Sequence, residues 1–243
     1  MTNRSLISIV IPTLNEEAVL GSTLETIQSQ PSPFEVIVVD GHSTDATRER
    51  ARAAGATVLQ APRGRASQLN QGAQAANGTI LLFLHADTRL PSSALSLIRQ
   101  TIAEPEATAG TFRLQFDDST PLLRFYGWCT HWSWIRLCFG DRGLFVTREA
   151  FETVDGYPNW PLFEDLELAA RLHEHGGFRF LDTAVTTSAR RFRRNGLLVQ
   201  QLRNLYLWLH YVAGADPERV AHLYRYHNGD SSPSSNTADV SGQ

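Results

Sequence analysis

The alternation of short apolar runs with helix-like segments in the N-terminal third of the chain limits its possible folds most strongly. Four apolar, largely β-branched runs occur at short, regular spacing: Leu6–Ile11, Phe34–Val39, Ala56–Leu59 and Leu81–Leu84. Helix-like segments separate them, one opening at Asn15 and two more at Ala46–Ala54 and Ala66–Ala76. This order predicts an α/β fold with a doubly wound, mostly parallel sheet. Right-handed crossovers would place all four strand ends on one edge.

The remainder of the chain shows no internal repeat and no clean linker. Its expected elements are a helix over 92–103, strands over 108–116 and 144–147, a helix opening at Glu164, strands over 178–181 and 185–188, and helices over 196–213 and 216–226. We therefore predict one domain over residues 1–189 with a helical extension packed on it over 190–227. Residues 228–243 are rich in Ser, Asn, Asp and Gly, a composition that predicts a disordered tail.

Composition excludes several classes of function. The 243-residue chain has a net charge of −3, so no global basic field favours nucleic acid. Every basic residue is arginine, and the lack of lysine excludes Schiff-base chemistry and a P-loop. Its two cysteines, Cys129 and Cys138, are too few for a disulfide framework or a four-cysteine zinc site.

The sequence also bears on location. The N-terminal residues run directly into a strand without the apolar stretch of a signal peptide. No window reaches the ~18 apolar residues that span a bilayer. We therefore expect a cytoplasmic protein.

Polar residues follow the predicted strands where each one ends. Glu17, Asp40, Arg65 and Asp87 should converge on one edge of the sheet, where open α/β sheets bind ligands. Asp87 follows a buried apolar run directly, and its carboxylate suits a hard cation such as Mg²⁺ or Mn²⁺. The alternative is that Asp87 only caps the next helix, although Pro91-Ser92-Ser93 supplies a start signal of its own.

Three later features are open to two interpretations each. Glu164 and Asp165 head a helix, where acids also favour the macrodipole without any chemical role. The cluster Arg190–Arg194 is either a solvated face or a site for phosphate. In the aromatic segment 121–139, Leu122, Phe125, Cys129 and Trp132 fall at helical spacing, which favours core packing over a ligand platform.

Five motifs in this order resemble those of a family-2 glycosyltransferase of the GT-A fold. They are Pro12-Thr13-Leu14-Asn15-Glu16, Val39-Asp40-Gly41-His42-Ser43, Arg63-Gly64-Arg65, His85-Ala86-Asp87 and Phe163-Glu164-Asp165. The resemblance covers roughly Leu6 to Leu181. His85-Ala86-Asp87 in place of Asp-x-Asp, Gly140-Asp141-Arg142-Gly143 and Tyr224-Arg225 are similar to the motifs of a small bacterial subgroup.

The resemblance implies an inverting hexosyl or related transferase that moves a sugar from a nucleotide-diphosphate donor to an acceptor hydroxyl. Asp165 would be the general base, with Glu164 beside it orienting the acceptor or raising the pKa of the base. Asp87 would bind the Mg²⁺ or Mn²⁺ ion that assists departure of the diphosphate. Arg65 would contact the diphosphate itself.

The remaining site residues are also implied by the resemblance. The nucleotide would be held by Pro12, Thr13, Asn15, Glu17, Asp40, Gly41, Ser43, His85 and Ala86, with Asp40 on the base edge and His85 on ribose or phosphate. Acceptor or diphosphate contacts would come from Asp141, Arg142, Trp160, Arg190 and Arg191. Asp141 and Arg142 alternatively form a structural pair. His85, where the family more often has aspartate, lowers the negative charge available to a metal.

Two competing functions remain. A sugar-nucleotide nucleotidyltransferase should have a Gly-rich, basic loop after the first strand, and here that loop is acidic at Glu16 and Glu17. A non-catalytic sugar-nucleotide binder would bind the donor without turnover. A dehydrogenase is excluded because no Gly-x-Gly-x-x-Gly follows a strand.

The helix expected over 196–213 carries more apolar surface than a narrow core stripe requires, and arginines precede it directly. This pattern suits an interfacial helix on anionic lipid, and an acceptor linked to lipid would give it a purpose. The protein would then lie peripherally on the inner face of the cell membrane. The alternatives are that the helix covers the sheet edge or buries its second face in a homodimer.

Overall fold

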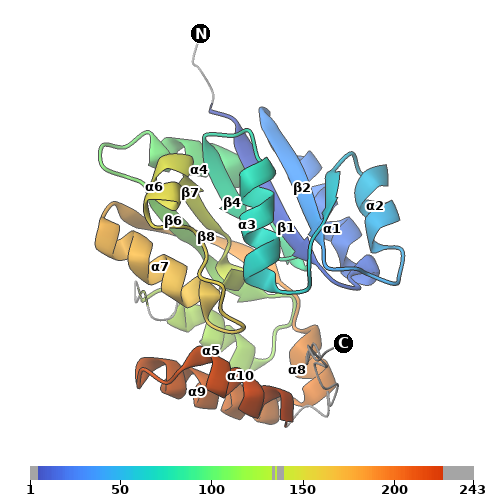
Figure 1. The fold of residues 1–243 in the computed structure, drawn as a ribbon, viewed down its shortest axis with the longest axis vertical. Coiled ribbons are helices and arrows are strands. Elements are labelled where there is room, and N and C mark those ends of the chain that lie inside the picture. The colour runs from blue at the N-terminus through green and yellow to red at the C-terminus, as the bar shows by residue number, and fades with distance from the viewer. Residues whose placement is uncertain (1–4, 133–134, 136–139, 227–243) are drawn as a thin grey trace, which may run out of the picture.

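The computed structural model describes residues 5–132, 135 and 140–226 (Figure 1). The strands are β1 (Ile7–Thr13), β2 (Phe34–Asp40), β3 (Thr57–Gln60), β4 (Ile80–Phe83), β5 (Thr88–Arg89), β6 (Ala109–Phe116), β7 (Leu144–Thr147) and β8 (Phe178–Thr187). The helices are α1 (Glu17–Gln28), α2 (Thr47–Ala53), α3 (Arg65–Ala75), α4 (Ala94–Ile102), α5 (Pro121–Cys129), α6 (Arg148–Thr153), α7 (Glu164–His175), α8 (Arg190–Asn195), α9 (Leu197–Val212) and α10 (Pro217–Tyr226), with a 3-10 turn, η2 (Gly140–Arg142).

All these strands form one mixed sheet in the order β3-β2-β1-β4-β7-β6-β8-β5. The pairs β2–β3, β1–β2, β1–β4 and β6–β8 are parallel, which confirms the doubly wound half predicted from the N-terminal alternation. β7 runs antiparallel between β4 and β6, and β5 runs antiparallel to β8. The two strands predicted over 178–181 and 185–188 are one continuous strand, β8, because both halves pair with β6 across a register shift near Thr111.

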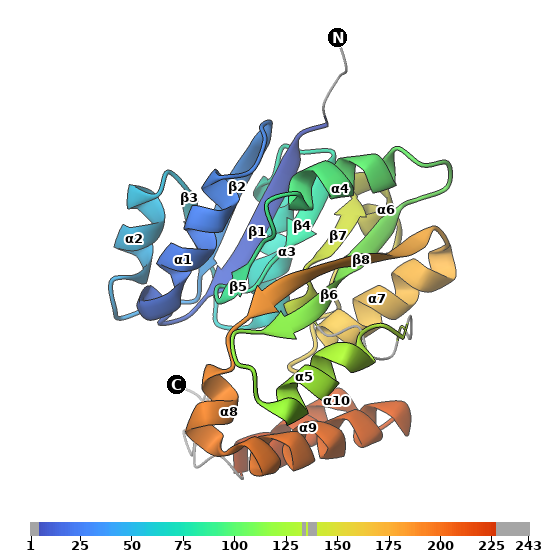
Figure 2. The same cartoon turned by 180° about the vertical axis from the view of Figure 1, so that it is seen from behind.

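Helices cover both faces of the sheet. Successive residues of a strand point to opposite sides, so the apolar residues of a buried strand pack against helices on each face. In β1, Ile9 and Ile11 join a cluster with residues of α1, α2 and α4, whereas Val10 joins a second cluster with α3, α6 and α7. The views in Figures 1 and 2 show these two helical layers in turn. The core thereby fixes the direction of the strands and the edge at which they end.

Helices α5, α8, α9 and α10 lie together beyond the end of the sheet, and we call this group the cap (Figures 1 and 2). β1 runs from the opposite end of the molecule toward the cap, so the cap faces the carboxyl ends of the parallel strands. The predicted boundary after residue 189 falls at the start of α8. The tail predicted over 228–243 lies outside the described residues. No helix in the described ranges is long and apolar enough to cross a membrane.

The prediction that the apolar residues at helical spacing in segment 121–139 pack in the core was wrong. Phe125 and Trp132, assigned to the core, are 56% and 51% exposed, and the buried residues of α5 are Leu123 and Gly127. The reason is a close approach to β6. A Cβ on Gly127 would lie 2.9 Å from the Leu114 carbonyl oxygen, so only a residue without a side chain fits there. Cys138 lies outside the described residues.

A candidate active site at the sheet edge

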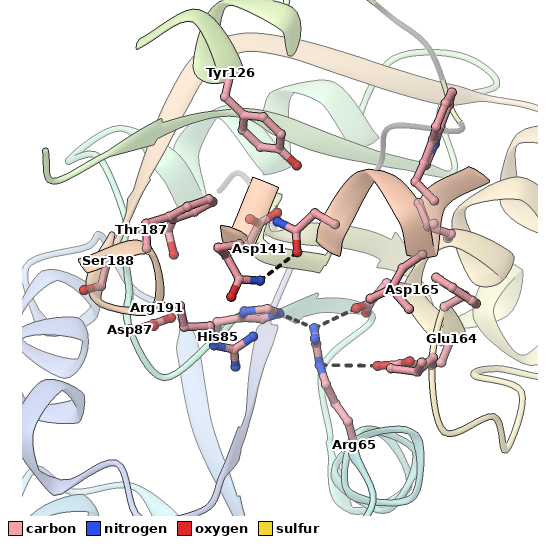
Figure 3. Close-up of a pocket in the computed structure, with 18 of the residues that line it drawn as sticks. Arg65, His85, Asp87, Tyr126, Asp141, Glu164, Asp165, Thr187, Ser188 and Arg191 are labelled. Atoms are coloured by element: carbon pink, nitrogen blue, oxygen red, sulfur yellow. Dashed lines mark hydrogen bonds and ion pairs between the residues drawn. The ribbon is translucent and has the colours of Figure 1, made fainter. Parts of the chain in front are cut away.

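A cavity of about 440 Å³ lies between the ends of the strands and the cap (Figure 3). Its charged side chains come mostly from the strand ends and α7, with Arg191 of α8, and its aromatic side chains come mostly from the cap, with Phe116 of β6 and Phe163 before α7. The charged side consists of Arg65, His85, Asp87, Asp141, Glu164, Asp165 and Arg191. The aromatic side consists of Phe116, Tyr126, Phe163, Phe192 and Trp208, joined by Gln200, Asn204 and Leu207 of α9. A ligand here would meet ionised groups at one end and apolar rings at the other.

Arg65 holds the charged side together. It is the first residue of α3, and its side chain reaches across the cavity floor to α7 and to the end of β4 (Figure 3). One guanidinium nitrogen lies 2.8 Å from Asp165 Oδ2, and Nε lies 3.6 Å from Glu164 Oε1. Burial would lower the pKa of Arg65, but Asp165 and Glu164 together raise it above its ordinary value.

His85 completes this group as a neutral imidazole. Its Nε2 contacts the Arg65 guanidinium, which can only donate, so Nε2 accepts and the proton resides on Nδ1. Burial, followed by the nearby Arg65, holds the pKa of His85 well below its usual range. A neutral His85 adds no positive charge beside the arginine.

Glu164 and Asp165 open α7 after Phe163, which adopts a left-handed backbone conformation with φ of 68°. Bulky residues rarely adopt this conformation, and strain of this kind is concentrated at functional sites. Burial, and then the Asp165 charge, raise the pKa of Glu164 to about 7, with Arg65 opposing the rise. Near neutral pH the pair therefore carries less than two full negative charges.

Asp141 also lines the cavity, from the turn η2. Burial is the main cause that raises its pKa to about 6, and its Oδ1 has no hydrogen-bond partner among the described residues. Arg142, for which a structural role was one of two interpretations, does not line the cavity. Its side chain is fully buried and donates to the carbonyl oxygens of Phe112 (2.9 Å) and Thr130 (3.3 Å). Arg142 thus supports the wall of the cavity from behind, which favours the structural alternative for this residue over a ligand contact.

A second, smaller hollow of about 150 Å³ shares Arg65, His85, Asp87 and Arg191 with the first. It is also lined by Pro12, Thr13, Leu14, Glu16, Gln68, Ala86 and Arg190. Arg190 of α8 joins its two carboxylates, at 2.5 Å from Glu16 Oε2 and 3.2 Å from Asp87 Oδ2. This ion bridge links the cap to the ends of β1 and β4.

The loops after β1 and β2 are clamped to each other by several residues expected to bind nucleotide. Asn15 Oδ1 accepts from the Thr44 backbone at 2.8 Å, and Glu17 accepts from the Ala46 backbone at 2.8 Å. Asp40 is fully buried and accepts from the Ser43 backbone at 2.9 Å and from the Ser43 hydroxyl. Gly41 donates to the Thr13 carbonyl at 2.8 Å. The residues Asn15, Glu17, Asp40, Gly41 and Ser43 line neither of the two cavities, and direct contact with a nucleotide stays a prediction for them.

Some predicted residues lie apart from both cavities, and other residues were missed. Trp160 lines neither cavity, although its neighbours Pro161 and Leu162 do. Glu16 lines the smaller hollow but was not among the predicted site residues, although its neighbours Asn15 and Glu17 were. Tyr126 was missed because its segment was assigned to the core. Trp208 could not be found from local sequence, since it reaches the cavity only through the folding back of α9.

Asp87 does not cap the next helix, because α4 begins at Ala94 with Ser93 before it. Its carboxylate is free of a capping role, lines both cavities and pairs with Arg190 at 3.2 Å. No group of three or more His, Cys, Asp or Glu side chains able to hold a metal occurs in the described part of the chain. The carboxylates that line the two cavities fit a different kind of site, in which one or two of them hold a Mg²⁺-like ion together with substrate phosphates.

Replacing Asp141 by asparagine should change how stability depends on pH. The fold favours the neutral carboxyl, so this contribution to stability is complete below pH about 4 and is lost as the pH rises through about 6. Asp141→Asn is neutral throughout, and we expect its melting temperature to exceed that of the wild type by about 2–6 °C at pH 8 but not near pH 4. Thermal unfolding followed by circular dichroism measures this.

The control for this prediction is Asp182→Asn, whose side chain is 90% exposed and should alter the melting temperature little. A difference between Asp141→Asn and the wild type that is the same at both pH values would contradict the assignment. A lower melting temperature of Asp141→Asn at pH 8 would contradict it as well.

Comparison with known proteins shows the family to which this chain belongs. A probable glycosyltransferase of Bacillus subtilis, YdaM, is 26% identical over 74% of this chain and 50% of its own length. A PGL/p-HBAD biosynthesis glycosyltransferase of Mycobacterium tuberculosis is 31% identical over 63% of each chain. The chain thus matches only half to just under two thirds of the length of these relatives.

Solved structures show the same fold. Glucosyl-3-phosphoglycerate synthase from Mycobacterium tuberculosis superposes with a TM-score of 0.63 over 87% of this chain and 81% of that one, at 19% identity. The fold is therefore that of the GT-A glycosyltransferases. The sequence pattern of glycosyl transferase family 2 matches residues 8–154, which is more than half of the sequence. On this evidence, the chain belongs to glycosyl transferase family 2.

Proposed function

We propose that the protein transfers a sugar from a nucleotide-diphosphate donor to an acceptor hydroxyl, with inversion at the anomeric carbon and assistance from a divalent cation. The observation that carries this proposal is the placement of Asp165 and Glu164 across one cavity from Asp87, with Arg65 between them. A carboxylate on one side and a phosphate-binding group on the other are what a direct displacement at a sugar carbon requires.

The donor occupies the smaller hollow in this proposal. Its diphosphate lies near Arg65, Arg190 and Arg191, whose guanidinium groups suit phosphate oxygens. The glucosyl-3-phosphoglycerate synthase structure is a complex with Mn²⁺ and UDP, which supports a cation here. Asp87, with Glu16 nearby, would hold such an ion, and the ion would neutralise charge on the leaving diphosphate. His85 stays neutral and donates through Nδ1 to ribose or phosphate.

The acceptor occupies the larger cavity. Asp165 takes the proton from the acceptor hydroxyl as its oxygen attacks the anomeric carbon, and the bond from that carbon to the diphosphate oxygen breaks. The nucleoside diphosphate leaves with the bonding electron pair. Arg65 pairs with Asp165 in the structure, so an Arg65 drawn toward the diphosphate would leave Asp165 more basic. Asp141 accepts from another acceptor hydroxyl through its unpartnered oxygen.

We also infer a class of acceptor and a subgroup of the family for this protein. A lipid-linked acceptor is supported by the aromatic cap side of the cavity, which offers apolar surface beyond the reacting end. Membership of the small subgroup with His85-Ala86-Asp87 is supported by the position of this motif at the end of β4. Homodimerisation through α9 is the competing use of its outer face.

The two alternatives give different products. A nucleotidyltransferase releases pyrophosphate, and a binder releases nothing. The transferase proposed here releases nucleoside diphosphate, and water can serve as a slow acceptor while the natural acceptor is unidentified.

Asp165→Asn tests the role of the base. The substitution preserves shape but cannot take a proton, so release of nucleoside diphosphate from a responsive sugar nucleotide should fall roughly 10²–10⁴-fold. Affinity for the nucleoside diphosphate should stay nearly unchanged. Glu167→Gln is the matched control, because Glu167 lies on the same helix and pairs with Arg171 outside the cavity. An equal loss of nucleotide affinity in Asp165→Asn would show that the role is wrongly assigned.

Asp87→Ala tests the cation site. It should remove the part of nucleoside-diphosphate binding that depends on Mg²⁺ or Mn²⁺, lowering affinity in the presence of the ion about tenfold or more. Calorimetric titration with the ion and with EDTA measures this part separately. Asp182→Ala, an exposed acid on β8, serves as the control. If the variant keeps the full cation dependence of the wild type, Asp87 does not hold the ion.

A further inference from the structure

The outer face of α9 carries an apolar stripe that nothing in the described chain covers. Along α9, exposed apolar side chains recur every three or four residues: Val199, Leu202, Leu205, Tyr206, Leu209 and Val212, with Leu202 68% exposed. A helix on the surface of a globular protein normally turns such a stripe toward the core. Contiguous exposed apolar patches mark surfaces that bind a membrane or another protein. We call these six residues the α9 stripe.

The opposite face of α9 is already in use. Gln200 is buried, and Gln200, Asn204, Leu207 and Trp208 line the cavity of the candidate active site. The helix therefore cannot bury its stripe by rotating inward without removing one wall of that cavity. The α9 stripe faces outward because the opposite face of α9 forms a wall of the cavity.

A second apolar group occurs on the same cap. Phe125, Trp128 and Trp132 are each about half exposed, and their rings are in contact in series. Phe125 stacks on Trp128 with ring centroids 5.8 Å apart, and Trp128 meets Trp132 edge to face with centroids 5.1 Å apart. Of the ten large apolar side chains exposed in the described chain, all but Leu14 belong to the α9 stripe or to this aromatic group. Amphipathic rings such as tryptophan favour the boundary between lipid and water.

The charge of the cap indicates what covers the stripe. Residues 190–212 contain five arginines and no acidic residue, in a chain whose net charge is −3, and α10 adds Arg219 and Arg225 against Glu218. Arg190 and Arg193 are paired with acids of the sheet edge, so the excess of positive charge rests on the other arginines of the cap. Residues 121–132 add Arg124 and again no acid. Arginines beside an apolar helical face complement an anionic lipid surface. Residues 227–243 cannot serve as a cover by composition, since Val240 is their only large apolar residue.

We propose that the cap docks on an anionic lipid bilayer, with α9 lying in the plane of the interface and its stripe among the headgroups and upper acyl chains. The helix does not span the bilayer, because it is not long and apolar enough. Docking places the cavity, walled by the other face of α9, directly above the lipid surface. The proposal concerns binding alone and stands whether or not the cavity transfers sugar.

Flotation of the intact protein with vesicles tests this docking. Vesicles of phosphatidylcholine with an equal share of phosphatidylglycerol should carry the protein upward at about 0.05 M salt. Binding should be at least about tenfold weaker at about 0.5 M salt or with phosphatidylcholine alone, because the charge term is screened. Protein left unbound by the anionic vesicles at low salt would overturn the proposal, as would binding insensitive to both lipid charge and salt.

A pair of double variants separates the stripe from general charge effects. Leu202→Glu with Leu209→Glu should weaken binding to anionic vesicles at least about tenfold. Gln100→Glu with Ala103→Glu adds the same charge on exposed positions at α4, at the opposite end of the molecule (Figure 1), and should bind as the wild type does. Equal binding by the two double variants would contradict the assignment to the stripe.

Folding and self-association of these proteins are measured alongside flotation. Thermal unfolding should be similar for both double variants, since all four positions are exposed. Sedimentation equilibrium should show a monomer for the wild type. A wild-type dimer that Leu202→Glu with Leu209→Glu splits would assign the stripe to a second copy and overturn docking on lipid. Asp165→Asn should float like the wild type, so failure of the proposed transfer reaction would leave this result unchanged.

Discussion

The ion group around Arg65 is the interaction on which the arrangement of the site depends. One guanidinium joins the start of α3 to Glu164 and Asp165 at the start of α7, and contacts His85 after β4. Three segments far apart in sequence are thereby fixed around one cavity. Because removing one partner would leave buried charge uncompensated, these groups must stay together or change partners together. A phosphate ligand is the kind of partner for which Arg65 could leave its carboxylates.

A second ion group ties the cap to the same edge. Arg190 bridges Glu16 and Asp87, so the positions of α8 and of the loop after β1 are coupled to the predicted cation ligand. α9 follows α8 and closes the cavity with one face while it exposes apolar residues on the other. The packing of α8 and α9 against the sheet edge therefore has two consequences: it brings charged side chains into the site, and it leaves apolar side chains of α9 exposed outside the site.

Sequence patterns predicted the local features and missed those that depend on distant contacts. The four N-terminal strands, Arg65 at the start of α3 and Asp87 beyond β4 follow from period and turn signals, and they are where we expected them. The antiparallel insertion of β7 between β4 and β6 has no local signal. The packing face of α5 was misplaced because the close approach of Gly127 to Leu114 is invisible to hydrophobic periodicity. The charged side chain of Arg142 favoured an exposed or ligand-facing position, yet it is buried and donates to two backbone carbonyl oxygens.

In the proposed mechanism, Arg65 faces the diphosphate of a nucleotide ligand. Calorimetric titration of UDP and GDP against the corresponding nucleosides tests it most directly, with Arg63→Gln as the control because Arg63 is exposed two residues earlier. Arg65→Gln should lose at least about tenfold in affinity for the diphosphate that the wild type binds and keep its affinity for the nucleoside. Equal diphosphate affinity in Arg65→Gln and the wild type would contradict the account.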